Sequence, residues 1–221
     1  MSRALAPDGR AFPTFTEMLG VYEVSIHIRR LTQALLDVSD DMALLATNAE
    51  ITADRSRGER GALTVIANEA KRIAVETERL VSEIRRTSTR LERESMAGVL
   101  KAREMSQYLL ACQLTGREEV RSVIEESLMT AGGHLQASIR EVHVALERMA
   151  QYRQSIDKLN DRSAIVATYF RIEASRDEAG NYFHSIASTL DTLYTQVAEV
   201  LGELQRILGI SRSVKTWAEA G

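Results

Sequence analysis

The sequence predicts an all-α protein in which two helical hairpins form a long antiparallel four-helix coiled-coil bundle. Both prolines, Pro7 and Pro13, lie near the N-terminus, so the residue that interrupts helices most effectively does not occur from position 14 onward. Hydrophobic side chains also recur alternately three and four residues apart in four stretches, which is typical of helices packed against other helices. Aromatic residues make up only 5% of the chain, and this composition favours helices over strands.

The first predicted helix follows an irregular N-terminal arm at residues 1–18. A partner helix is needed to bury its apolar stripe, which consists of Val21, Val24, Ile28, Leu31, Leu35, Val38, Met42, Leu45 and Ala49. Gly58 and Gly61 favour a sharp turn at residues 58–61. The second helix carries the stripe Leu63, Ile66, Ala70, Ile73, Thr77, Leu80, Ile84, Thr87 and Leu91.

A reversal of the chain is predicted at Thr115, because Thr115 and Glu118 have the spacing of a capping box at the start of a new helix. Gly132 and Gly133 offer a competing break, and the sequence leaves both positions open. The third helix has the stripe Leu135, Ser138, Val142, Ala145, Met149, Tyr152, Ile156, Leu159, Ser163, Val166 and Phe170. After a turn at residues 178–181, the fourth helix has Ile186, Leu190, Leu193, Val197, Val200, Leu204 and Ile207.

Four segments follow from these boundaries. The expected segments are the arm at 1–18, a first hairpin at 19–114, a second hairpin at 117–212 and a C-terminal tail at 213–221. The two turns lie about 55 and about 64 residues from the reversal, so at 1.5 Å per residue the arms of the hairpins have comparable lengths and both turns end near one another. The first and fourth helices are shorter than the other two. Residues 100–142 are therefore expected to project as a two-helix stalk, or to be covered by the arm or by a second chain.

Composition excludes several classes of function. The net charge is −3 with both signs interspersed, which gives no basic patch for nucleic acid and no polybasic patch for a membrane surface. No apolar run approaches the roughly 20 residues of a membrane span, and the N-terminus has no secretory signal. Cys112 is the single cysteine, which fits a reducing compartment. We therefore expect a soluble, cytoplasmic protein.

No catalytic, metal or cofactor site is expected from the sequence. The histidines of the chain are His27, His134, His143 and His184. None of them pairs with a carboxylate or with Cys112 at the spacing of metal ligands. A glycine-rich phosphate loop would need a preceding strand, and no strand is predicted. We therefore interpret the chain as non-enzymatic.

One stretch, from Leu44 to Ala74, carries a more specific pattern. It combines Leu-Leu-Ala-Thr-Asn-Ala-Glu-Ile at 44–51 with Arg55, with Val-Ile-Ala at 65–67 and with Glu69. This pattern resembles, without a gap, the signalling hairpin of methyl-accepting chemotaxis receptors. In that family the cytoplasmic domain is a dimer of such hairpins, and the tips of the resulting four-helix bundle bind a histidine kinase and its coupling protein.

A second copy of the pattern lies at residues 164–193, with one residue fewer at its turn. It retains Ile172, Glu173, Ala174, Arg176, Gly180, Phe183, Ile186 and Ala187. The resemblance therefore implies two degenerate receptor hairpins in one polypeptide, which together form a covalent pseudo-dimer. Both copies depart from the family pattern near their turns: Thr52 replaces a glutamate, Ala62 and Leu63 replace Gly-Phe, and Tyr169 replaces an asparagine.

The resemblance implies a receptor-like signalling or adaptor module of a bacterial chemosensory system. Its partners would be a chemotaxis histidine kinase, a coupling protein or chemoreceptors, without nucleic acid, membrane insertion or a cofactor, and association into a homodimer is left open. The expected partner-binding residues are Asn48, Glu50, Arg55 and Glu59 at the first turn, and Arg171, Glu173, Arg176 and Phe183 at the second.

Three other interpretations are weighed against this one. Glu125 and Glu126 lie in Ser122–Thr130, which approximates a receptor methylation motif, although a solvated helix face explains the same residues. Glu147 and Gln151 are one helical turn apart, a spacing with which a helical-bundle phosphatase could orient water toward a phosphorylated response regulator, but such pairs are common on exposed helices. A structural coiled-coil protein is the third alternative.

Overall fold

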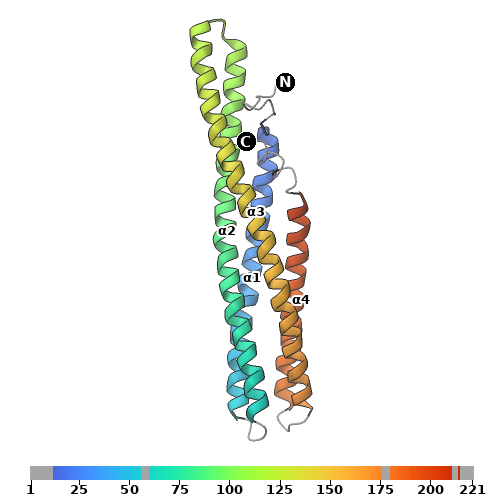
Figure 1. The fold of residues 1–221 in the computed structure, drawn as a ribbon. Helices are drawn as coiled ribbons and strands as arrows, with labels where there is room; N and C mark the ends of the chain where they lie inside the picture. Colours follow the sequence, from blue (N-terminus) through green and yellow to red (C-terminus); the bar gives the residue numbers. More distant parts are fainter. Residues whose placement is uncertain (1–11, 56–59, 176–179, 211–213, 215–221) are drawn as a thin grey trace. The chain divides into compact units, whose positions relative to one another are not determined.

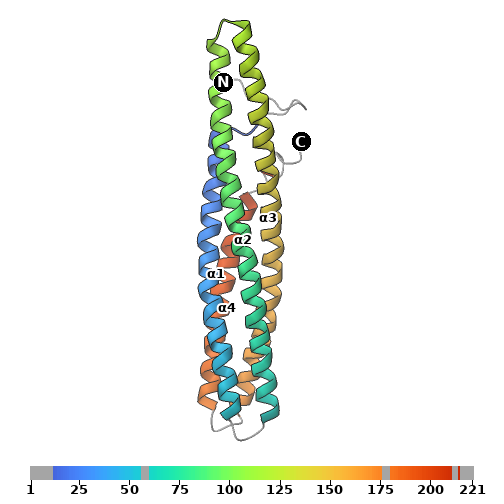
Figure 2. The same cartoon turned by 90° about the vertical axis from the view of Figure 1, so that its left-hand side faces the viewer.

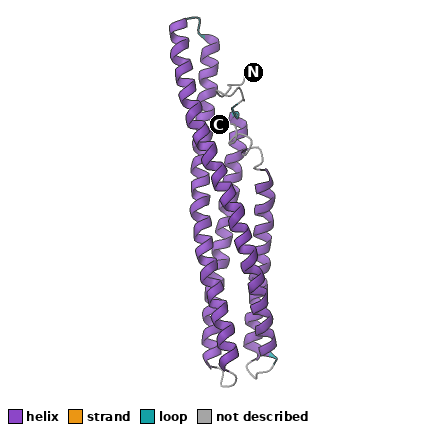
Figure 3. Cartoon of the chain, in the orientation of Figure 1, coloured by secondary structure: helices purple, strands orange, loops and turns teal. Residues whose placement is uncertain are grey.

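The computed structural model describes residues 12–55, 60–175, 180–210 and 214 of the chain. These residues form four α-helices that pack against one another, and no strand occurs among them (Figures 1 and 3). The helices are α1 (Phe15–Arg55), α2 (Arg60–Leu114), α3 (Glu118–Ala174) and α4 (Gly180–Ile210). The predicted all-α bundle of two helical hairpins is confirmed.

Helix α1 begins at Phe15, within the stretch that was expected to be an irregular arm. A capping box starts the helix there. The carboxylate of Glu17 accepts a hydrogen bond from the Thr14 N–H (2.6 Å), and the Thr14 hydroxyl accepts one from the Glu17 N–H (3.3 Å). Two of the backbone donors at the helix start are thereby satisfied. The Thr-x-x-Glu spacing at 14–17 is the sequence signal for this boundary.

The chain reverses at Thr115, since α2 ends at Leu114 and α3 begins at Glu118. The expected capping box does not form in the predicted way. In a capping box the backbone N–H of Thr115 would donate a hydrogen bond to the Glu118 side chain. In the structure this N–H donates to the Ala111 carbonyl (3.0 Å) and extends the hydrogen bonding of α2. The Thr115 hydroxyl instead accepts a hydrogen bond from the Arg117 N–H (3.5 Å).

The four helices divide between two compact units that cut across the hairpins. We call the first the reversal unit; its described residues fall within Met1–Arg29, Thr87–Met149 and Arg206–Gly221. The second, which we call the turn unit, consists of the described residues within Arg30–Arg86 and Ala150–Gln205. The turn unit contains the ends of both receptor-like hairpins, which lie at one end of that unit (Figures 1 and 2).

The buried stripe of α1 differs from the prediction at three positions. Val21, Val24 and Leu31 are only half-buried. The residues that follow the last two, Ser25 and Thr32, are 0% and 2% exposed. Ser25 satisfies its hydroxyl within the helix by donating to the Tyr22 carbonyl (2.7 Å). A periodicity traced through large apolar residues misses such positions, because small hydroxyl side chains can also occupy a close-packed seam. On α2 every residue of the predicted stripe is buried.

In the reversal unit, α2 and α3 extend beyond the start of α1 (Figures 1 and 2). No side chain between residues 106 and 130 is fully buried, and Leu114 is 78% exposed. Residues 12–16 and 102–113 line a shared groove, so the N-terminal residues cover the base of this two-helix stalk. The stalk and the covering arm, which were alternatives in the prediction, therefore both occur.

Gly132 and Gly133 lie inside α3 and differ in their surroundings. A Cβ atom on Gly133 would meet nothing within 4 Å, whereas one on Gly132 would lie 3.0 Å from Cζ of Phe12. Gly133→Ala is therefore expected to raise the free energy of unfolding by about 1 kcal/mol, the usual difference in helix propensity. Gly132→Ala should gain less, because the Phe12 ring must shift. Urea denaturation of the two variants tests this, and equal gains would contradict the packing of Phe12 on Gly132.

Candidate interaction surface at the two turns

The internal repeat has a structural counterpart in the turn unit. Residues 44–54 align with 165–175, and residues 62–79 align with 182–199. Every position that is buried in one copy is also buried in the other. The hydroxyl of Thr47 donates to the Ala43 carbonyl (3.0 Å), and that of the aligned Thr168 donates to the Ala164 carbonyl (2.9 Å). The two hairpins thus present the same faces to the core.

An ion pair joins the two helices of each hairpin at the same aligned positions, but with opposite polarity. In the first hairpin Lys71 Nζ lies 2.8 Å from a carboxylate oxygen of Glu50. In the second, Arg171 replaces Glu50 and Asp191 replaces Lys71, and these two side chains form an ion pair. Both pairs are largely exposed, so each stabilises the fold by at most about 1 kcal/mol. Their importance is that aligned positions of the two hairpins are paired in the same way.

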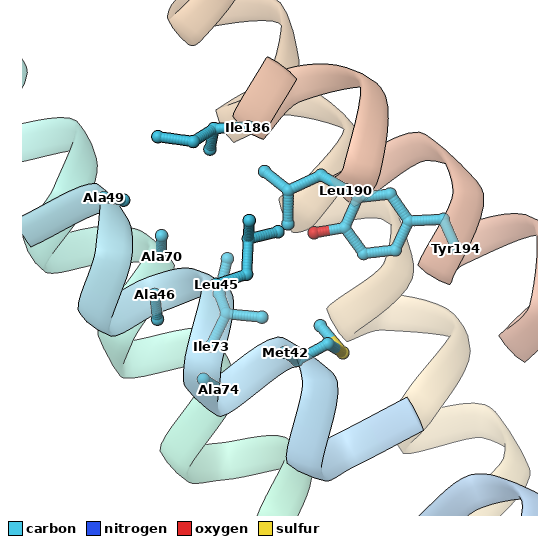
Figure 4. A pocket seen from close by; sticks show the side chains of 10 residues that line it. All are labelled: Met42, Leu45, Ala46, Ala49, Ala70, Ile73, Ala74, Ile186, Leu190 and Tyr194. Carbon is cyan, nitrogen blue, oxygen red and sulfur yellow. The ribbon is translucent and has the colours of Figure 1, made fainter. Parts of the chain in front are cut away.

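The two hairpins differ in the size of their core side chains. Phe170 and Phe183 stack with ring centroids 6.0 Å apart, whereas the aligned residues of the first hairpin are Ala49 and Leu63. Further from the turns, α4 directs bulky side chains toward alanines of α1 and α2 (Figure 4). The residues that line this contact are Met42, Leu45, Ala46, Ala49, Ala70, Ile73, Ala74, Ile186, Leu190 and Tyr194. Large residues on one hairpin thus compensate small residues on the other.

Tyr194 makes this core sensitive to alkaline pH. Burial raises the pKa of Tyr194 to about 12, compared with about 10 for an exposed tyrosine. Between these pKa values the unfolded chain loses the phenolic proton while the folded chain keeps it. The contribution of Tyr194 to the free energy of unfolding is therefore fully present below pH 10 and is lost as the pH rises toward 12. The loss is up to about 1.4 kcal/mol per pH unit.

Tyr194→Phe should remove this part of the pH dependence. The test is urea denaturation of both proteins at pH 9, 10 and 11. The variant should lose less stability than the natural chain between pH 10 and 11, and equal losses would contradict a buried, protonated Tyr194.

The predicted site residues fall into three groups. Asn48 is exposed, Glu173 is half-buried, and Glu50 and Arg171 form the ion pairs described above. Phe183 is 0% exposed, so the expectation that it contacts a partner from the outside of the bundle is corrected: its ring supports the turn from within. Arg55 is the last residue of α1, and Glu59 and Arg176 lie outside the described residues.

Sequence reasoning missed the exposed apolar side chains near the turns. Leu44 is 62% exposed and Tyr182 is 69% exposed. The others are Ile51, Val65, Ile165, Tyr169 and Ile172. Leu44 and Ile51 lie outside the predicted core stripe of α1, and this mismatch was the available signal. Apolar side chains gathered on an exposed surface are typical of interaction sites.

A groove between α1 and α4 collects several of these side chains. Its volume is about 620 Å³. The lining residues are Asp41, Leu44, Leu45, Asn48, Ile51, Thr52, Tyr182, Ser185, Ile186, Thr189 and Leu193. The groove therefore combines apolar contact area with hydroxyl and amide groups and one carboxylate. This combination is suited to binding a protein segment.

The aligned face between α2 and α3 is bridged by an ion-pair network. Arg162, which aligns with Asp41, lies 2.6 Å from Glu69 and 2.8 Å from Glu76. Hydrogen bonds to these two carboxylates raise the pKa of Arg162 further above its usual range. Thr189 of the α1–α4 groove aligns with Glu69, so that groove contains no equivalent bridge among its lining residues. The two faces are related by sequence but differ in chemistry.

The remaining candidates lie away from the turns. Glu125 and Glu126 are exposed on α3. Glu147 and Gln151 are also exposed, and the Glu147 carboxylate lies 3.4 Å from Nε2 of His143. Within the described ranges no three histidine, cysteine or acidic side chains gather as a metal site would require.

Two further findings concern the chain as a whole. None of the helices described in the structure is sufficiently long and apolar to cross a membrane. Comparison with protein-family models, with curated proteins and with solved structures gives no match.

Proposed function

We propose that this chain is a receptor-like signalling or adaptor module of a chemosensory system, and that it binds a histidine kinase, a coupling protein or chemoreceptors through the side of the turn unit near its two turns. The proposal assigns no catalytic role to the chain. The two hairpins act as a single-chain equivalent of a receptor dimer.

The observation that carries this proposal is the repeated hairpin with exposed apolar residues beside each turn. The aligned burial patterns and the aligned ion pairs support a fused pair of related hairpins. Leu44, Ile51 and Tyr182 on one face, with Ile165 and Tyr169 on another, supply apolar contact area near the turns. The receptor-like pattern at Leu44–Ala74 supports the choice of chemosensory partners.

Titration calorimetry tests the proposal directly. The full chain is titrated with the chemotaxis histidine kinases, the coupling proteins and the signalling domains of chemoreceptors from the same organism. We expect saturable binding to at least one of them. The proposal fails if none of these proteins binds the folded chain.

A further inference from the structure

Positive charge is distributed unequally among the helices of the turn unit. Residues 31–54 of α1 and 182–205 of α4 contain no lysine or arginine. The acidic residues of these two segments are Asp37, Asp40, Asp41, Glu50, Asp54, Asp191, Glu199 and Glu203. In the same unit the lysine and arginine residues of the described helices belong to α2 and α3, except for Arg30 and Arg55, which lie at the two ends of the α1 segment.

Several acidic groups on α1 remain available to a partner. Glu50 and Asp191 are paired with Lys71 and Arg171. Asp40, Asp41 and Asp54 are exposed, and within the described part of the chain none of them forms an ion pair. Asp41 lines the α1–α4 groove itself. The groove therefore combines an apolar middle with one carboxylate, that of Asp41, on its α1 wall.

A helix suits this groove better than an extended segment. Both walls are helices whose backbone groups are already hydrogen-bonded, so they offer no edge to which a strand could add. Leu44, Asn48 and Ile51 follow one another at helical spacing along α1. An amphipathic helix packs its own side chains into such a row at positions i, i+3, i+4 and i+7.

We propose that the α1–α4 groove binds an amphipathic helix of a partner protein with an apolar ridge and lysine or arginine residues along its flank. The ridge packs against Leu44, Ile51 and Tyr182, and the basic flank lies against Asp41. This inference rests on the proposed function and specifies the chemistry of the partner segment.

The α2–α3 face provides an internal control. Ile165 aligns with Leu44 and is similarly exposed, but Arg162 and its two carboxylate partners bridge that face. The two carboxylates that bridge that face are already paired with Arg162, whereas Asp41 of the α1–α4 groove forms no ion pair within the described residues. Selectivity for the α1–α4 groove is therefore expected to arise from charge, since both faces offer apolar side chains.

The test is a selection from three displayed peptide libraries against the full chain. All three have the same apolar helical ridge, and their variable flanks are rich in lysine and arginine, in glutamate, or in uncharged polar residues. We expect enrichment of the basic library only. Truncating a central contact of an interface commonly costs more than 1 kcal/mol, so Leu44→Ser should weaken the selected peptides about tenfold. Ile165→Ser, the matched control, should leave their affinity unchanged.

Asp41→Asn should lower the affinity for the same peptides several-fold at low salt, which is the effect expected from losing one exposed charge pair. The difference in affinity should shrink as the salt concentration increases. Circular dichroism verifies that each variant is folded. The inference is overturned if no library is enriched, if acidic or uncharged peptides are selected equally, or if Ile165→Ser rather than Leu44→Ser abolishes binding.

The two proposals fail in different ways. If selected basic peptides bind the groove but no chemosensory protein binds the chain, only the proposed function is wrong. If a chemosensory protein binds with unchanged affinity to Leu44→Ser and to Asp41→Asn, the proposed function stands and the assignment of the groove is wrong.

Discussion

Replacing Phe183 by alanine is expected to lower the free energy of unfolding of the turn unit by about 3–5 kcal/mol, the usual cost of removing a buried phenyl ring. Phe183 is fully buried and stacks on Phe170. The variant removes both the transfer of the ring from water and its contacts with its neighbour, and it leaves a cavity beside the turn. Urea denaturation followed by circular dichroism measures the loss.

Tyr182→Ala is the matched control for this prediction. The two residues are adjacent in α4 and both are aromatic, but Tyr182 is largely exposed. Substitutions at such positions usually change stability by less than about 0.5 kcal/mol. A loss at Phe183 no greater than that at Tyr182 would show that the stacked pair is not a core contact.

The fold could be predicted because the information lies in local spacing. The stripe of α2 from Leu63 to Leu91 is buried in full, since large apolar residues repeat there at the period of a packed helix. The reversal at Thr115 was also identified, and the competing break at Gly132 lies inside α3, where a Cβ on Gly132 would meet the ring of Phe12. In the sequence, a pair of glycines inside a helix resembles a helix break until the side chains packed against it are known.

The candidate site was harder to predict, because exposure depends on which helices become neighbours. Phe183 belongs to the receptor-like pattern and was assigned to a contact surface, yet it is buried against Phe170. Leu44 and Ile51 belong to the same pattern and are exposed on a groove wall. Residue type alone did not distinguish the buried Phe183 from the exposed Leu44 and Ile51. Their exposure depends on the groove, which forms only when α1 and α4 lie side by side.

The unequal core of the two hairpins leads to the second large effect. Ala49 aligns with Phe170, is fully buried and lines a cavity of only about 10 Å³ (Figure 4). A phenyl ring cannot enter this space without displacing neighbouring side chains. Ala49→Phe is therefore expected to lower the free energy of unfolding by about 1–3 kcal/mol. Phe170→Ala should lower it by about 3–5 kcal/mol through the cavity it leaves.

The double variant Ala49→Phe, Phe170→Ala tests whether the two positions share a core layer. It moves one ring between aligned positions of the two hairpins and conserves the total core volume, which cores tolerate better than a net change. We expect its loss to be smaller than the sum of the single losses by more than about 0.5 kcal/mol, the range seen for residues that couple. Unfolding free energies of the four proteins complete this double-mutant cycle.

The control pairs Ala49→Phe with Leu204→Ala. Leu204 is buried in the same unit, but its distance from Phe183 along α4 is about 30 Å. Sites this far apart should give additive losses. If the exchange between positions 49 and 170 is also additive, each hairpin packs independently of the other. Coupling at 49 and 170 alone instead means that each hairpin requires the side-chain sizes of the other, so the two copies have become mutually dependent halves of one core.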